Sequence, residues 1–232
     1  MNENSTSLNK YLAETGICSR READKIIDAG RVKINGTVAR KGNRVFEGDN
    51  VLLDDKPVNS KPKAVYLAFN KPPGIVCTTD QRERDNIIDF INYPQRIFPI
   101  GRLDKFSEGL ILLTNDGDVV NKILRVEHQH EKEYHVTVNK PVTKAFIEGM
   151  QNGVPILDTV TQKCRVFQKG KYDFKIILTQ GLNRQIRRMC EHFDYHATKL
   201  KRVRIINLRL GGLPPGKWRQ LTEKEMKLLK LR

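Results

Sequence analysis

The 232-residue chain carries 42 Lys and Arg residues against 27 Asp and Glu, which gives a formal net charge of +15. Its hydrophobic content of 38% is ordinary for a globular protein and argues against disorder over most of the chain. No apolar run approaches the ~18 residues that cross a bilayer, and the first 20 residues lack the apolar stretch of a signal peptide. These features predict a cytoplasmic protein with no membrane partner.

The cysteines and histidines show no metal-ligand spacing. The four cysteines stand far apart, so we expect reduced thiols and neither a zinc knuckle nor a redox dithiol. The histidines have no second cluster of carboxylate or thiol ligands beside them, so we expect no metal. The residues are Cys18, Cys77, Cys164 and Cys190, and His128, His130, His135, His192 and His196.

The positive charge is concentrated in one part of the chain. Residues 1–160 hold 23 basic and 22 acidic side chains, whereas residues 161–232 hold 19 basic and 5 acidic ones. Such a local excess favours a surface that binds a polyanion, nucleic acid in particular. The alternatives are charge that serves solubility alone, and a membrane-surface role. The latter is weaker because no single amphipathic helix gathers the basic residues.

A flexible tail over residues 1–6 precedes a small module of two helices and a hairpin. Its second helix begins at a capping box of Ser19 and Glu22 and ends at Gly30. The turn Asn35-Gly36 between two alternating segments predicts the hairpin. The predicted elements are a helix over 8–14, the capped helix between 19 and 30, and strands at 31–34, 37–39 and 51–53.

Residues 56–64 are polar, contain two prolines and predict a linker, so the module occupies residues 7–55 and a second domain residues 65–232. The helices of the second domain are short and do not recur between every pair of strands. This pattern favours an α+β fold with a mixed, largely antiparallel sheet over a doubly wound one. Predicted strands are 65–69, 97–100, 110–113, 134–138, 174–178 and 201–210, and predicted helices are 86–91, 118–124, 143–150 and 185–192.

The first module contains Leu8-Asn-Lys-Tyr-Leu, Ser19-Arg-Arg-Glu-Ala-Asp24 and Gly30-x-Val-x-Ile-Asn-Gly36. Together these segments resemble the S-four-type RNA-binding module, named after a small-subunit ribosomal protein, over nearly the whole of residues 7–54. In that family the helices and the hairpin dock on structured RNA, which implies that Arg20 and Arg21 contact phosphates. From the residues alone, a cationic helix face beside several acidic residues is as readily a solvated surface.

The segment Phe98-Pro-Ile-Gly-Arg-Leu-Asp104 places an acidic side chain on a loop just beyond an apolar strand, between Arg102 and Lys105. Such an aspartate is commonly a turn former or a helix cap. Alternatively, it is a reactive carboxylate that the neighbouring cations keep ionised. The segment alone leaves both interpretations open.

Three further segments accompany this loop: Asn70-Lys-Pro-Pro-Gly74, Glu131-Lys-Glu-Tyr134 and Gly181-Leu-Asn-Arg-Gln-Ile-Arg-Arg-Met189. In this order, with Gly101-Arg-Leu-Asp104, they resemble the pseudouridine synthases of the RsuA/RluF type. The match extends over essentially all of residues 65–232, and an appended RNA-binding module is typical of that family. The segments look closest to members that act on large-subunit rRNA.

The resemblance implies conversion of a uridine in RNA to its carbon-linked isomer, without a cofactor or a metal. By position, Asp104 matches the family's catalytic aspartate and Arg187 the arginine that pairs with it. Tyr134 matches the tyrosine that stacks on the target uracil, and Leu178 the apolar residue packed against the base. From the residues alone, Tyr134 is more often a core or edge aromatic, Leu178 is usually a core side chain, and Arg187 is usually a solvated helix residue.

The same segments supply two further RNA-binding candidates. Arg102, beside the catalytic position, is a candidate to fill the place in the RNA that the target base vacates. Arg184 belongs to the segment that carries Arg187 and is a candidate contact to the substrate.

The implied chemistry explains these residue types. Breaking the bond between ribose and base demands a carboxylate near the sugar, either to attack carbon 1′ or to remove a sugar proton, and the sequence does not choose between them. An adjacent arginine fixes the direction of the carboxylate and favours its anionic form. The freed uracil must turn and rebond without escaping, which an aromatic face and an apolar wall favour.

We expect a monomer whose partner is RNA, most simply 23S rRNA. The same chemistry on a tRNA anticodon stem-loop is one alternative, since a stem-loop can share the recognised shape. A non-catalytic rRNA-binding or ribosome-assembly factor is another. The acid at position 104 argues against it, because a pure binder has no need of an anion facing phosphate.

Overall fold

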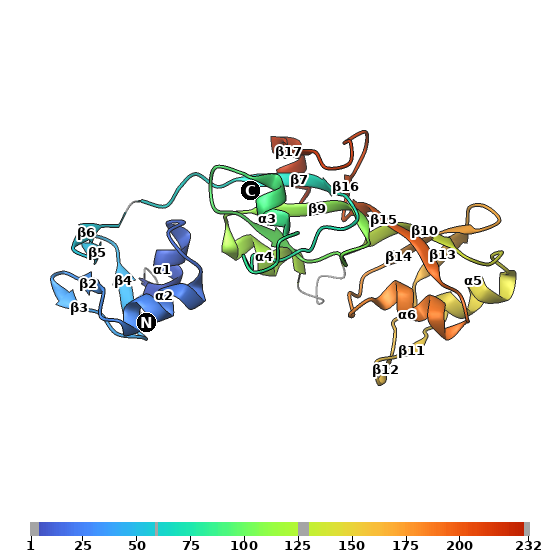
Figure 1. Ribbon diagram of the computed structural model, residues 1–232, viewed down its shortest axis with the longest axis horizontal. Coiled ribbons are helices and arrows are strands. Elements are labelled where there is room, and N and C mark those ends of the chain that lie inside the picture. Colours follow the sequence, from blue (N-terminus) through green and yellow to red (C-terminus); the bar gives the residue numbers. More distant parts are fainter. Residues whose placement is uncertain (1–4, 59, 125–129, 230–232) are drawn as a thin grey trace. The chain divides into compact units, whose positions relative to one another are not determined.

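The computed structural model describes residues 5–58, 60–124 and 130–229, which form two compact units (Figure 1). The smaller unit contains the described residues up to Ala64 together with Pro94–Arg96 and Asn115–Gly117, and the larger unit contains the remaining described residues. Each unit has its own buried apolar core. Among the residues described, no helix has both the length and the apolar character needed to cross a membrane.

The small unit packs two helices against short strands around one apolar core. Its second helix begins as the sequence predicts: the Ser19 hydroxyl accepts from the Glu22 amide at 3.2 Å, and the Glu22 carboxylate accepts from the Ser19 amide at 2.6 Å. The elements are α1 (Leu8–Glu14), α2 (Arg20–Asp28), β2 (Val32–Ile34), β3 (Thr37–Val38), β5 (Val51–Leu53) and β6 (Lys56–Pro57), the strands in the order β3-β2-β5-β6. Its core is formed by Leu8, Leu12, Cys18, Ala23, Ile27, Val32, Ala39, Val45 and Val51.

Two segments of the small unit are more ordered than the sequence predicts. The flexible tail expected over residues 1–6 does not include its last two residues, because β1 (Ser5–Ser7) pairs antiparallel with β4 (Arg44–Phe46). The Arg44 guanidinium holds this strand by donating from Nε to the Ser5 hydroxyl at 2.7 Å. At the other end, the first two residues of the expected linker form β6, which completes a sheet edge where a proline is tolerated.

The large unit is built on one sheet of nine strands. These are β7 (Tyr66–Lys71), β8 (Phe98–Ile100), β9 (Glu108–Thr114), β10 (Lys132–Val138), β13 (Arg165–Gln168), β14 (Asp173–Leu178), β15 (Ala197–Ile205), β16 (Leu208–Arg209) and β17 (Trp218–Gln220). Their order is β13-β14-β10-β15-β9-β7-β17, with β16 beside β15 and β8 beside β9. All the pairs are antiparallel except β9 with β15. The predicted mixed, largely antiparallel α+β fold is confirmed.

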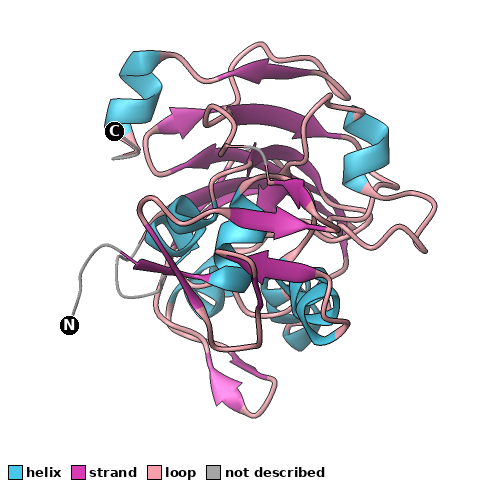
Figure 2. Ribbon diagram, turned by 90° about the vertical axis from the view of Figure 1, so that its left-hand side faces the viewer, coloured by secondary structure: helices cyan, strands magenta, loops and turns pink. Residues whose placement is uncertain are grey.

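The helices of the large unit are α3 (Ile87–Ile91), α4 (Gly117–Leu124), α5 (Lys144–Gln151), α6 (Gln185–His192) and α7 (Glu223–Leu228). Figure 1 shows α5 and α6 on the same side of β10, β13 and β14, where Phe146 and Met189 enter the core. The helix beside the C label in Figure 2 is α7, which follows β17 at the edge of the sheet. The sequence predicted α3 to α6 but not α7.

The strand predicted over 201–210 is divided in the structure, because β15 ends at Ile205, Ile206 has a φ of +53°, and β16 follows at Leu208. The short strands β13 and β17, and the hairpin β11 (Pro155–Ile156) with β12 (Thr159–Val160), were not predicted. Segments of two to four residues are too short to carry a periodic pattern, and pairing with distant strands decides their conformation.

The parallel pair of β9 and β15 needs a glycine. Gly109 lies opposite Arg202 in the register and has a φ of +105°. A Cβ at position 109 would lie 2.3 Å from the Arg202 carbonyl oxygen, a distance that no side chain can occupy without moving the backbone. The missing side chain therefore lets the two strands approach each other.

We expect Gly109→Ala to lower the free energy of unfolding by about 2–4 kcal/mol, because the new methyl group meets backbone and the φ is unfavourable for alanine. Urea denaturation of the purified protein measures this change. Gly212→Ala is the matched control, since no heavy atom lies within 4 Å of a Cβ there. Equal stability of the two variants would contradict a tight contact at the β9–β15 pair.

Candidate active site

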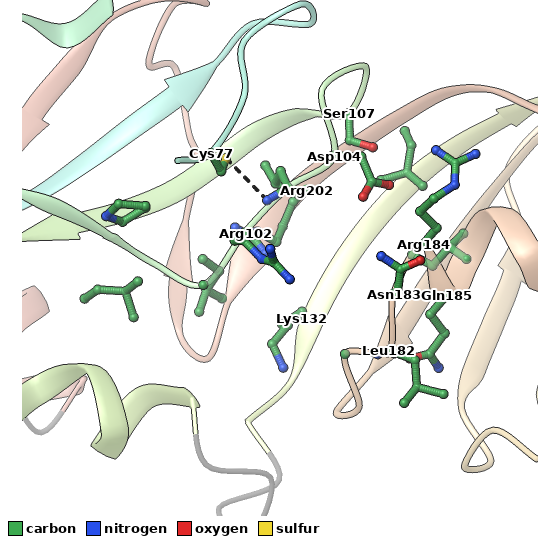
Figure 3. A pocket seen from close by; sticks show the side chains of 18 of the residues that line it. Cys77, Arg102, Asp104, Ser107, Lys132, Leu182, Asn183, Arg184, Gln185 and Arg202 are labelled. Atoms are coloured by element: carbon green, nitrogen blue, oxygen red, sulfur yellow. Dashed lines mark hydrogen bonds between the residues drawn. The ribbon is translucent and has the colours of Figure 1, made fainter. Parts of the chain in front are cut away.

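A cleft of about 1140 Å³ lies in the large unit over the strands β10, β14 and β15. The segments that line it also include the loop after β8 and the turn that leads into α6. Figure 3 shows charged and polar side chains from these segments converging on the same space, with Asp104 and Arg102 on one segment and Asn183, Arg184 and Gln185 on another. The cleft therefore collects residues that are far apart in the chain.

Asp104 enters the cleft from the loop between β8 and β9. Its side chain is 34% exposed, and its backbone carbonyl accepts from the Ser107 amide at 3.0 Å, which tightens the loop. The carbonyl of the next residue, Lys105, accepts from the Gly74 amide at 2.7 Å. The loop is thus tied on both sides of the carboxylate, and Asp104 is held in place while remaining accessible from the cleft.

Lys71, at the end of β7, is the buried group behind this loop. Its ammonium donates to the carbonyl oxygens of Pro72 at 2.9 Å and Lys105 at 3.1 Å. The side chain has no exposed surface, and burial lowers the pKa of Lys71 to about 8. Lys71 therefore joins the Asn70–Gly74 segment to the loop that carries Asp104.

Arg187 of α6 lies beside the carboxylate. Its Nε is 3.8 Å from Asp104 Oδ2, while Nη1 donates to the Ala197 carbonyl at 2.7 Å and Nη2 to the Ser107 hydroxyl at 3.4 Å. Nε itself is buried and has no hydrogen-bond partner among the described residues. The two outer nitrogens thus hold the guanidinium while the free N–H faces the carboxylate.

The turn before α6 is held by a buried amide side chain. Gln185 accepts from the Leu182 amide at 3.0 Å through Oε1 and donates to Gln180 Oε1 at 3.2 Å. Arg184, the residue before the helix, takes a left-handed conformation with a φ of +49°. This conformation is uncommon for a residue with a side chain, and it leaves the Arg184 side chain exposed at the cleft.

Pairing across the sheet sets the apolar and aromatic part of the cleft. Tyr134 of β10 lies opposite Ile176 of β14 and is 8% exposed, and Lys132 lies opposite Leu178. Since residues two apart on a strand share a face, the Lys132–Leu178 pair lies on the Tyr134 side of the sheet. The Lys132 ammonium donates to the Thr179 carbonyl at 2.9 Å, and burial lowers its pKa.

A buried thiol supports the loop from below. The Leu103 amide donates to Cys77 Sγ at 3.4 Å, and burial raises the pKa of Cys77. The thiol is therefore uncharged at neutral pH and acts as a weak hydrogen-bond acceptor beneath the loop that carries Asp104.

The structure brings together six of the eight predicted site residues: Asp104, Tyr134, Arg187, Leu178, Arg102 and Arg184 all line the cleft. Arg20 and Arg21 lie elsewhere, on the exposed face of α2 in the small unit. Among the residues described, no group of three or more His, Cys, Asp or Glu side chains is placed to hold a metal ion. Three carboxylates line the cleft, Asp80, Glu83 and Asp104, and of these Asp104 lies beside Arg187.

Several polar residues of this site were not predicted from the sequence, among them Lys71, Ser107, Lys132 and Arg202. Lys71 and Lys132 lie within segments that carry the family resemblance, which gave no reason to single them out. Arg202 had a signal of its own, because it stands two residues after the apolar Leu200 and so shares its buried face on an extended strand. Ser107 had none.

Comparison with known protein families finds two matches. A family described as RNA pseudouridylate synthase matches residues 65–192, and the S4 domain matches residues 6–51. The first match contains Asp104, Tyr134, Leu178 and Arg187, and the second contains α1 and α2. The two matches therefore cover the cleft and the small unit separately.

Individual proteins that match most of the chain indicate the same family. The dual-specificity RNA pseudouridine synthase RluF of Salmonella typhi is 57% identical over 228 residues, which cover 97% of this chain and 79% of that protein. The ribosomal large subunit pseudouridine synthase B of Bacillus subtilis is 36% identical over 232 residues, covering 96% of this chain and 95% of that one. A crystal structure of a pseudouridylate synthase matches with a TM-score of 0.71 and 29% identity, and covers 96% of this chain and 99% of its own.

We expect Lys71→Met to lower the free energy of unfolding by about 1–3 kcal/mol, because two buried carbonyl groups lose their donor. Thermal denaturation measures this, with Lys144→Met, an exposed side chain, as the matched control. The destabilisation should grow between pH 8 and 10. The pKa of Lys71 is about 8 when folded against an ordinary 10.5, so in this range the unfolded chain holds more protons and the wild type gains stability as pH rises. A loss that is the same at both pH values would contradict the buried ammonium.

Proposed function

We propose roles for the residues of this cleft on one premise: the chain belongs to the RNA pseudouridylate synthase family and is an RNA pseudouridine synthase, an isomerase. Family membership confirms the activity that the sequence predicts and excludes a non-catalytic binding factor. The small unit is an S4 domain, an RNA-binding module. The roles below follow from the geometry of the cleft.

Asp104 is the catalytic carboxylate. The observation that supports this role is its pairing with Arg187, whose otherwise unpartnered Nε lies 3.8 Å from the carboxylate in the cleft. The guanidinium aims the carboxylate and favours its anion, which either attacks carbon 1′ of the ribose or removes a sugar proton. Both routes break the bond between ribose and base.

Tyr134 and Leu178 hold the target base. Both line the cleft, and both are buried enough to keep water from one face of the uracil. A detached uracil that rests on an aromatic ring and an apolar wall can turn and rebond through carbon 5 before it escapes. The register that pairs β10 with β14 supports this role, since it places the two side chains on one face of the sheet.

Arg102 and Arg184 are exposed at the cleft and face the RNA around the target nucleotide. An extruded base leaves its neighbours unstacked at a cost of a few kcal/mol. Arg102, two residues from Asp104, fills the vacated place in the RNA, and Arg184 binds the phosphate backbone. The charge excess of residues 161–232 supports the second role.

The substrate is a uridine in large-subunit (23S) rRNA. The relatedness to the ribosomal large subunit enzyme of Bacillus subtilis supports this assignment. A second substrate, a tRNA anticodon stem-loop, is supported by the dual specificity of the 57% identical relative. The proposed enzyme acts as a monomer, and in the cytoplasm, where both proposed RNA substrates are found.

We expect Asp104→Asn to abolish pseudouridine formation by at least about 1,000-fold, since it keeps the size of the side chain and removes its charge. Pseudouridine is mapped site by site in rRNA and tRNA from cells that lack the gene and are supplied with the wild type, Asp104→Asn or Asp194→Asn. The last variant is the control, because Asp194 is exposed and its left-handed backbone suits asparagine.

Modification at an rRNA position and at a tRNA position should return with the wild type and with Asp194→Asn alone. Return of either mark with Asp104→Asn would refute the catalytic role. Restoration in tRNA only would refute the rRNA assignment and leave the chemistry intact.

We expect the double variant Arg20→Gln, Arg21→Gln to weaken RNA binding. The slope of log Kd against log salt should fall by about 1 for each arginine, because fewer counterions are released on binding when a phosphate contact is lost. Arg31→Gln is the control: its guanidinium already pairs with Asp54, through Nε at 2.8 Å. Filter binding over a range of salt measures both. Equal slopes for the control and the double variant would contradict a phosphate contact at α2.

A further inference from the structure

Arg202 of β15 has an unused hydrogen-bond donor at the cleft. The residue is 4% exposed, and its Nε donates to the Leu110 carbonyl at 2.6 Å. Its Nη2 is buried and has no hydrogen-bond partner in the part of the chain that the structure describes. A buried donor without a partner costs free energy, so an Arg at this position suggests a ligand that completes the bond.

The fold fixes the guanidinium in place. Arg202 lies opposite Gly109 in the parallel pair and opposite Tyr134 in the pair of β15 with β10. Its guanidinium carbon is 6.0 Å from the centre of the Tyr134 ring. Backbone contact on one side and the aromatic ring on the other leave the side chain little freedom, so its donor is pre-organised beside the proposed uracil site.

The charge of Arg202 is also uncompensated. No ion pair to Arg202 is found among the described residues, whereas Arg187, whose side chain is 12% exposed, lies beside Asp104. Burial and the nearby positive charge of Arg202 both lower the pKa of Lys132. A fixed cation with no counter-charge stabilises negative charge that appears near it during a reaction.

We propose that Arg202 donates from Nη2 to a carbonyl oxygen of the target uracil and stabilises the negative charge of the departing base. This role rests on the proposed function of the cleft. When the bond between carbon 1′ and N1 breaks, its electron pair leaves with the base, which becomes a uracil anion with charge shared among N1, O2 and O4. Carbon 1′ regains its electrons from an Asp104 oxygen, or from the carbon 2′–hydrogen bond when Asp104 removes that proton.

Uracil fits this donor better than a phosphate does. The Nη2 atom is enclosed and lies near Tyr134, and Leu178 and Leu200 line the same cleft, so the position suits a flat and mostly apolar ligand. A phosphate carries its charge on a hydrated group, and the exposed Arg102 and Arg184 can reach it without its dehydration. The buried and the exposed arginines of the cleft therefore serve different parts of the substrate.

The test compares single-turnover rates of wild type, Arg202→Met and Arg202→Lys on a short RNA whose target is uridine or 5-fluorouridine. Fluorine withdraws electrons and stabilises the departing anion, so the fluorinated base needs less help. We expect Arg202→Met to consume uridine 100- to 1,000-fold more slowly than wild type. With 5-fluorouridine this loss in rate should be at least tenfold smaller. The Kd for the RNA should change less than threefold. Arg202→Lys, which keeps a cation, should exceed Arg202→Met at least tenfold.

Arg204→Met separates chemistry from stability. Arg204 is on the same strand and is 12% exposed, but its Nε pairs with Glu133 at 3.0 Å and it does not line the cleft. The variant Arg204→Met should lower the melting temperature at least as much as Arg202→Met does. Its single-turnover rate should stay within threefold of wild type. An unchanged rate in Arg202→Met, equal losses on both substrates, or a loss confined to Kd would each overturn the proposal. Inactivity of the wild type would instead refute the proposed function.

Discussion

The large sheet contains one parallel pair of strands, β15 and β9, in which Arg202 lies opposite Gly109. On one side of this pairing are β9, β7 and β17, and on the other are β15, β10, β14 and β13. The loop with Asp104 leads directly into β9, whereas Tyr134, Leu178 and Arg187 all belong to the other side. The distance between Asp104 and the side chains proposed to bind the base therefore depends on this pair of strands, and Gly109 lets the two strands approach each other closely.

Three largely buried cations lie at or behind the cleft that contains Asp104, and each has different hydrogen-bond partners. Lys71 uses its ammonium on backbone carbonyls and so holds the loop behind Asp104. Arg187 uses two nitrogens to hold itself and turns the third toward the carboxylate. Arg202 is anchored through Nε, and its buried Nη2, which has no partner among the described residues, is the donor that we propose contacts the substrate. Burying three positive charges is costly, and that cost explains why each is tied to the backbone by short hydrogen bonds rather than left to move.

Local patterns in the sequence were sufficient for the elements that local chemistry determines. The capping box at Ser19 and the α+β alternation of residues 65–210 depend on neighbours in the chain, and the structure has both. The motif around Asp104 identified the loop but left its surroundings open. The spacing of Arg202 from Leu200 indicates a buried face, but its place beside Gly109 and Tyr134 depends on strand pairing with residues far away in the sequence. The clamp of Lys71 on the Lys105 carbonyl likewise joins two loops that no local pattern connects.

The arginines of the chain thus fall into two groups with separable effects. Exposed ones, such as Arg20, Arg21 and Arg184, are open to solvent, and their attraction to phosphate is screened by salt and adds to affinity for any RNA of suitable shape. Arg202 is buried and the Arg187 side chain is only 12% exposed, so salt screens their charges less, and the role proposed for them concerns the rate. Extruding a base from its stack costs a few kcal/mol before any bond is broken. In the proposed mechanism, the exposed arginines offset that cost when the RNA binds. The fixed charges of Arg187 and Arg202 can then act on the transition state alone.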